Sequence, residues 1–233
     1  DDHTNLGWDA ALGGLTTHAL PDRTRIALGL SDLTLTVLNA DERSQTLPLD
    51  GCTDAEVRVW LGQQLTAKGV ARSLDEPSPY EMPPHAIASG GRYTTTELTE
   101  PLHMLGIWYA DADGLLGRVR EKPSIRKHKA PKVRCWPHHF DLDSLVSLGR
   151  DRTVGLGFSP GDEYCDEPYF YASIYPDPKI PALPLLPPIG HWHTHEFVAA
   201  FAPAHKIVAA KDQGREIEQF FDVAIGAALH PAR

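Results

Sequence analysis

Three histidines alternate along one short segment, His191-Trp192-His193-Thr194-His195. In a β-strand, residues two apart share a face and are spaced by about 6–7 Å. His191, His193 and His195 would therefore project together. Neutral imidazoles on one face are typical ligands of Zn²⁺, Ni²⁺ or Fe²⁺. The segment predicts a metal site in which zinc would need a fourth ligand or a water molecule.

A second segment could complete that site. If 133–142 is one strand, His139 and Asp141 share a face, and pairing with the strand of His191 would bring one of them to the metal. The expected cofactor is Zn²⁺ or another divalent transition metal, and otherwise none. A bound metal would activate a water molecule for hydrolysis, with Asp141 or Glu196 as the general base. One function class is thus a metal-binding protein or metal-dependent hydrolase.

A structural role for these histidines stays open beside the metal site. Histidines on strands often hydrogen-bond to neighbouring strands or lie exposed, and a motif without structural context is a weak signal. The sequence has no HExxH motif and no paired CxxC motif. Alternation places Cys135 on the face of His139, which would permit a Cys–His pair. Burial of Cys135 as a small inert side chain is the commoner case.

Aromatic residues suggest a second function class. Tyr169, Tyr171 and Tyr175 alternate with Phe170 and Ile174 in another predicted strand. The tyrosine face could wall a pocket together with Trp136, Trp192 and Tyr164. It would then belong to a non-catalytic binding protein that holds an apolar ligand or a protein partner. A dry aromatic cavity without converging polar groups would favour this class over a metal enzyme.

Hydrophobic periodicity predicts an α+β fold. Strands are expected at 33–38, 44–49, 133–142, 153–158, 169–175 and 192–201, and helices at 4–18, 53–68, 96–118 and 212–229. Thr53 and Glu56 have the spacing of a capping box. We expect one large, curved, mostly antiparallel sheet with helices packed on one side. A strand-strand-helix unit used twice would fit this order.

The chain of 233 residues predicts a single α+β domain over 1–233. Two segments rich in Pro or Gly interrupt the pattern, an irregular crossing at 75–93 and a loop at 176–190. No apolar run reaches the ~20 residues that cross a bilayer, so no membrane partner is expected. The basic stretch from Arg118 to Arg134 either binds anions or is a solvent-exposed loop whose positive charge balances the acidic rest of the chain.

The formal net charge of −9 makes nucleic acid an unexpected partner. The three cysteines, Cys52, Cys135 and Cys165, are odd in number and widely spaced, which predicts free thiols and a cytoplasmic location. The expected partner is an unknown small molecule, and a homo-oligomer stays open. The sequence names neither the reaction nor the substrate.

Four stretches of the chain resemble a widespread family of uncharacterised bacterial proteins. The more specific are Phe140-Asp141-Leu142 and the Glu-Pro-x-x-Tyr-x-x-x-Tyr-Pro pattern of residues 167–176. The others are the predicted hairpin at 33–49 and the final strand with the helix from Asp212. The resemblance covers about residues 25–228 and marks the chain as a divergent member. It implies a shared fold and carries no activity.

Overall fold

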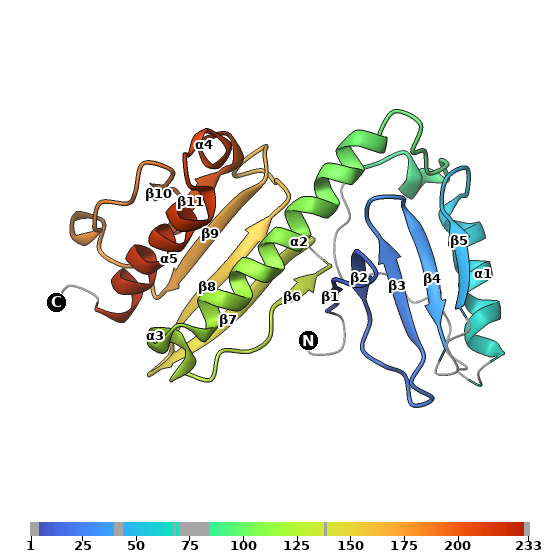
Figure 1. The fold of residues 1–233 in the computed structure, drawn as a ribbon, viewed down its shortest axis with the longest axis horizontal. Helices are drawn as coiled ribbons and strands as arrows, with labels where there is room; N and C mark the ends of the chain where they lie inside the picture. Colours follow the sequence, from blue (N-terminus) through green and yellow to red (C-terminus); the bar gives the residue numbers. More distant parts are fainter. Residues whose placement is uncertain (1–4, 40–43, 68, 70–83, 138, 231–233) are drawn as a thin grey trace. The chain divides into compact units, whose positions relative to one another are not determined.

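The structure is a computed structural model that describes residues 5–39, 44–67, 69, 84–137 and 139–230. The chain divides into two compact units, Asp1–Ile107 and Trp108–Arg233. The division falls inside a long helix, α2 (Thr99–Glu121), where the sequence predicted one domain. Each unit is described here by itself (Figure 1).

The first unit contains a five-stranded antiparallel sheet in the order β1-β2-β3-β4-β5. Its strands are β1 (Gly7–Asp9), β2 (Gly14–Thr16), β3 (Arg25–Gly29), β4 (Thr34–Leu38) and β5 (Ser44–Pro48). The predicted hairpin is β4 with β5. Helix α1 (Asp54–Thr66) follows, and the predicted capping box of Thr53 and Glu56 is present. A short 3-10 turn, η1 (Ile87–Ser89), precedes α2.

The helix predicted over 4–18 is wrong, because β1 and β2 occupy that segment. Gly13 adopts a left-handed φ of 58° at the turn between the two strands, a conformation that favours glycine. Gly14 then packs so closely on Leu28 that a Cβ would overlap its carbonyl. These glycines serve a tight hairpin, whereas they would weaken a helix.

The second unit contains a six-stranded antiparallel sheet in the order β10-β11-β9-β8-β7-β6. Its strands are β6 (Arg134–Trp136), β7 (Asp141–Gly149), β8 (Arg152–Ser159), β9 (Tyr169–Tyr175), β10 (His191–His193) and β11 (Ala199–Pro203). The helices besides α2 are α3 (Pro123–Arg126), α4 (Ala204–Ala209) and α5 (Gln213–Leu229). Asp212 caps α5 through a bond from the Arg215 N–H. A 3-10 turn, η2 (Ile180–Ala182), lies within the predicted Pro-rich loop.

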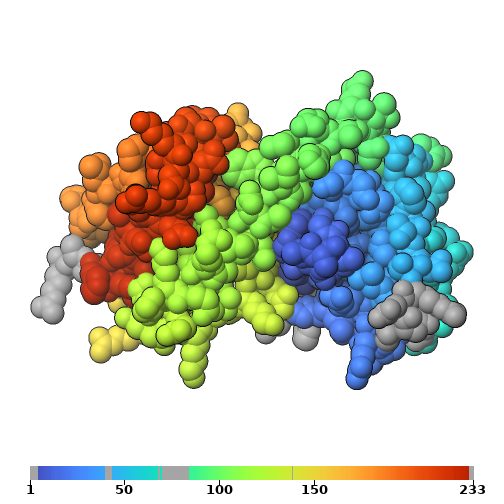
Figure 2. Space-filling model, viewed as in Figure 1, coloured from blue at the N-terminus to red at the C-terminus, as the bar shows by residue number. Residues whose placement is uncertain are grey.

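One face of this sheet packs against α2 and α5. Val154, Leu156 and Phe158 of β8 are all at most 1% exposed, and Phe158 stacks on Trp108 of α2 at 5.8 Å between ring centroids. Phe170 of β9 meets Phe221 of α5 edge-on at 6.0 Å. In the space-filling view, atoms of α2 and α5 lie over this face (Figure 2).

Two predicted strands are hairpins in the structure. Residues 133–142 divide into β6 and the start of β7, with the Phe140 N–H donating to the Trp136 carbonyl and Phe140 at a φ of 57°. Pro137 cannot donate to a sheet ladder, which favours a turn there. Residues 192–201 likewise divide between β10 and β11.

The α+β class is confirmed, with the strands in two sheets where the sequence predicted one. The predicted strands at 153–158 and 169–175 and the helices at 53–68, 96–118 and 212–229 correspond to β8, β9, α1, α2 and α5. Residues 75–83 of the predicted irregular crossing lie outside the described residues. No helix among the described residues is long and apolar enough to span a membrane.

Candidate binding pocket on the open sheet face

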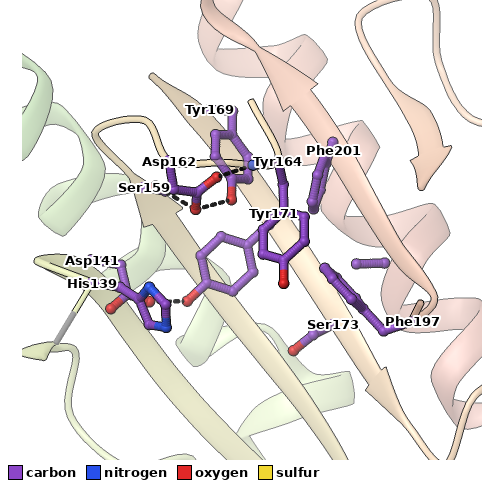
Figure 3. A pocket seen from close by; sticks show the side chains of 11 residues that line it. His139, Asp141, Ser159, Asp162, Tyr164, Tyr169, Tyr171, Ser173, Phe197 and Phe201 are labelled. Carbon is purple, nitrogen blue, oxygen red and sulfur yellow. Dashed lines mark hydrogen bonds between the residues drawn. The ribbon is translucent and has the colours of Figure 1, made fainter. Parts of the chain in front are cut away.

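A pocket of about 150 Å³ lies on the face of the six-stranded sheet that the helices leave uncovered. Tyrosine and phenylalanine rings form most of its wall, and two carboxylates and a histidine join them (Figure 3). Its lining residues are His139, Asp141, Ser159, Asp162, Tyr164, Tyr169, Tyr171, Ser173, Phe197, Ala199 and Phe201. All of them belong to the second unit.

The register of β8, β9 and β11 brings the central residues of the pocket together. Tyr171 of β9 lies opposite Gly157 of β8 and Phe201 of β11, and Ser159 lies opposite Tyr169. Residues directly opposite on antiparallel strands share a face, so these side chains meet above the sheet.

Gly157 makes room for the Tyr171 ring. A Cβ at position 157 would overlap the Tyr171 ring, which lies across β8. A Cβ at Gly155 would likewise overlap the Ser173 hydroxyl. The two glycines therefore form the floor on which the pocket side chains lie.

The Tyr171 hydroxyl lies between two carboxyl groups of β7. It donates to Asp141 Oδ2, and it is 3.0 Å from Asp143 Oδ2. Figure 3 shows the hydroxyl directed at Asp141, with His139 beside it. Burial raises the pKa of Tyr171 well above its usual value, and the nearby Asp143 and Asp141 carboxylates raise it further. The phenol is therefore neutral and acts as a hydrogen-bond donor.

Asp143 is the most perturbed carboxyl group of the site. Its Oδ1 is buried and has no hydrogen-bond partner among the described residues. Burial, and next the charge of Asp141, raise the pKa of Asp143 from 3.8 to about 7. A strongly perturbed group beside a pocket marks a candidate functional site.

Asp162 organises the other end of the pocket. Its Oδ2 accepts bonds from the Tyr169 hydroxyl at 2.7 Å and from Ser159 Oγ at 3.3 Å. Its Oδ1 accepts the backbone N–H groups of Tyr164 and Cys165. These backbone bonds form an Asx-turn, and together with the bond from Tyr169 they hold the loop between β8 and β9 against the sheet.

The third side of the pocket is aromatic. Tyr169 and Phe201 pack at 4.6 Å between centroids, and the His193 ring stacks on Phe201 at 5.1 Å. Tyr164 meets Phe197 edge-on at 5.0 Å. Faces of such rings attract cations through their quadrupoles.

The two segments that carry the predicted metal ligands do not pair in this arrangement. The strand of His191 and His193, β10, is four strand positions from β7, which carries Asp141. At ~4.8 Å per strand the two axes are roughly 19 Å apart. The pairing of these two strands, on which the shared metal site depended, is therefore wrong. His139 and Asp141 do meet, as lining residues of the pocket.

The histidines of the alternating run make other contacts. His193 Nε2 bonds the His195 carbonyl at 2.6 Å. Burial, followed by the charges of Lys206, His193 and His205, lowers the pKa of His191. His195 lies beyond β10 with its side chain 85% exposed, and Glu196, the other predicted base, is 62% exposed at a φ of 65°. Within the described part of the chain, no three His, Cys, Asp or Glu side chains are placed to hold a metal ion.

Cys135, which the sequence placed on the face of His139, lies in the buried core, whereas His139 lines the pocket. Cys135 pairs in register with Leu142, and both are fully buried. Trp136 lies opposite Asp141, so Trp136 shares the face of Asp141, contrary to the predicted alternation. The turn at 137–140 resets the phase between the two strands. Burial holds the pKa of the Cys135 thiol well above its usual value.

The parts of the pocket that sequence reasoning missed include Phe197 and Phe201 and, with them, Asp143, Asp162 and Gly157. A signal for two of them was present. Asp143 follows Asp141 at the two-residue spacing of one strand face, and Gly155-x-Gly157 inside a predicted strand is typical of a close approach by other groups. Asp162 ends the Ser-Pro-Gly-Asp segment 159–162, whose composition is typical of a turn and does not indicate a binding residue.

Comparison with known proteins gives no match to a protein-family model, a curated protein or a solved structure.

Proposed function

We propose that the chain is a non-catalytic binding protein whose open sheet face holds a small organic cation. The observation that carries this proposal is the composition of the pocket wall. Five aromatic rings and two aspartates line it, and no lysine or arginine is among the lining residues. An ammonium group would be attracted both by the ring faces and by the carboxylates.

The size of the pocket selects small ligands. A protein cavity of ~150 Å³ accommodates a molecule the size of benzene, and the pocket has about that volume. Small quaternary or substituted ammonium ions are of this size. A drug-sized ligand, which takes a pocket of about 300 Å³ or more, is too large.

The Asp141 carboxylate argues against the purely apolar ligand that the sequence suggested. A neutral apolar molecule would cover Asp141 without offering it a polar partner, and uncompensated desolvation of a charged group is costly. A cation compensates that loss. The converging polar groups therefore support a charged ligand on the predicted aromatic face.

The test is an NMR titration of the protein with tetramethylammonium at pH 8. We expect saturable shifts at pocket residues, with a dissociation constant in the millimolar range or below, and about tenfold weaker binding by Asp141→Asn, equivalent to ~1.4 kcal/mol. Asp166→Asn is the matched control, because it removes the same charge from an exposed residue that does not line the pocket. Equal weakening by both variants, or no saturation, would refute the proposal.

A metal-dependent hydrolase remains the other prediction from the sequence. Metal analysis of freshly purified, untagged protein tests it independently of the cation experiment. A stoichiometric transition metal that is lost in His193→Ala would favour it over the binding role.

A further inference from the structure

We propose that Asp141, Tyr171 and Asp143 form one proton-holding unit that couples occupancy of the pocket to proton release. The empty pocket holds a proton on the carboxyl pair, and a bound cation expels it to the solvent from Asp143. This inference rests on the proposed function and specifies how the site is regulated.

The hydrogen-bond geometry requires a proton to be shared. A phenol has a single proton, yet the Tyr171 hydroxyl lies within hydrogen-bonding reach of both Asp141 Oδ2 and Asp143 Oδ2. When Tyr171 donates to Asp141, its oxygen is left facing Asp143 as an acceptor. A protonated Asp143 then donates to it and completes a chain from Asp143 through Tyr171 to Asp141.

Among the described residues, the groups that shift the pKa of Asp143 are Asp141 and the Tyr171 hydroxyl, and neither is a cation. On β6, Arg134 lies opposite Asp143 in register. Its charge, after that of Arg120, lowers the pKa of Asp113 of α2, which burial raises, and it is not among the groups that shift the pKa of Asp143. On β9, Asp143 faces the neutral Tyr171. Strand β8 presents Gly157 opposite Asp143 in register and Gly155 beside its carboxyl group. On β7 its charged neighbour is Asp141. Two like charges in partly buried surroundings share one proton near neutral pH.

A cation in the pocket changes this balance. Asp141 lines the pocket and Asp143 lies directly behind it, across the Tyr171 hydroxyl. A positive charge there favours the doubly ionised pair, so the proton leaves Asp143 for the solvent. The pKa of Asp143, about 7 in the empty protein, places this release near neutral pH.

Because binding of the cation and release of the proton are linked, affinity for the cation should fall as pH is lowered. Above about pH 7 the pair is already ionised and affinity is constant. Below that pH the cation must displace the proton, so affinity falls by up to about tenfold for each unit of pH.

The experiment measures the dissociation constant of tetramethylammonium by NMR from pH 5.5 to 8.5, together with proton release on binding at pH 7 in a pH-stat. Wild-type protein should release up to about one proton per bound cation and lose affinity below pH 7. Asp143→Asn keeps the shape and removes the titrating group. It should release none, and its affinity should vary far less with pH.

Two further observations separate the outcomes. His139→Gln should retain the proton release, whatever its effect on affinity, because the proposed proton donor is Asp143. In wild-type protein, the ¹³C signal of the Asp143 carboxyl group should titrate near neutral pH and move to lower pH when the cation is added, a readout that needs no variant to fold. Binding of the cation without proton release overturns this inference and leaves the proposed function standing. Absence of binding at every pH overturns the proposed function as well.

Discussion

Asp143 should destabilise the folded protein at alkaline pH, and this can be measured without any ligand. Its pKa is raised by burial from 3.8 to about 7, so between these values the folded protein holds a proton that the unfolded chain has released. Stability from this residue is therefore greatest at low pH and falls as pH rises from about 4 to about 7.

Asp143→Asn should consequently raise the free energy of unfolding at pH 8 by up to about 4 kcal/mol, with a gain that shrinks toward pH 4. Urea unfolding of both proteins at several pH values checks this. If the Asn variant is less stable than wild type at pH 8, favourable interactions in the folded protein outweigh the cost of burying the ionised Asp143 carboxylate, and the prediction is wrong.

At the same scale, residue type and alternation predicted part of the pocket. Alternation placed Tyr169 and Tyr171 on one face of their strand. It also placed Asp141 and its neighbour Leu142 on the two different faces of theirs. The perturbation of Asp143 could not be predicted, because it depends on the buried position of its Oδ1 and on the tyrosine that reaches it from β9. Such contacts exist only after the strands pair.

At the scale of elements, β8 determines whether the pocket forms. Gly157→Ala should displace the Tyr171 ring, because the new Cβ would overlap it. We expect destabilisation of about 1–3 kcal/mol, as for overpacking in general, and loss of tetramethylammonium binding. Thermal unfolding and the NMR titration measure the two effects.

Gly117→Ala in α2 is the matched control, since a Cβ there meets nothing within 4 Å. In a helix interior this change should be neutral or stabilise by up to about 1 kcal/mol. If Gly157→Ala behaves like Gly117→Ala and still binds the cation, the glycine is not what seats Tyr171.

Turns explain where the prediction of elements failed. Periodicity located β8, β9, α1 and α5, whose hydrophobic patterns run without interruption. Periodicity predicted one strand where the structure has β6 and β7, and one where it has β10 and β11. The alternation of residue types in the sequence does not show that the backbone reverses direction between the two strands. It also read β1 and β2 as a helix, since the glycine hairpin between them is short.

At the scale of the whole molecule, strand order was beyond the sequence pattern. Alternation identifies a strand but not its neighbour, so the three strands between β10 and β7 could not be foreseen. That order separates the histidine run from Asp141 and brings Tyr171 beside it. For this reason we propose an organic cation held by rings and carboxylates in place of the predicted metal held by histidines.

The cysteines report on the integrity of the fold. All three are free thiols in the structure, with Cys135 buried and Cys52 and Cys165 partly exposed. A thiol reagent should modify Cys52 and Cys165 in the native protein, and Cys135 only after unfolding, because burial excludes the reagent and raises the pKa of the Cys135 thiol. Titration of unreduced protein before and after denaturation checks this. Fewer than three thiols after denaturation would contradict it.

Positive charge on the ligand should decide whether it binds. Parallel NMR titrations of the wild-type protein at pH 8 can compare tetramethylammonium with tert-butanol, a neutral molecule of similar size. We expect saturable binding of tetramethylammonium at the residues around Tyr171 and at least about tenfold weaker binding of tert-butanol. Equal affinity for the two, or binding of tert-butanol alone, would contradict it.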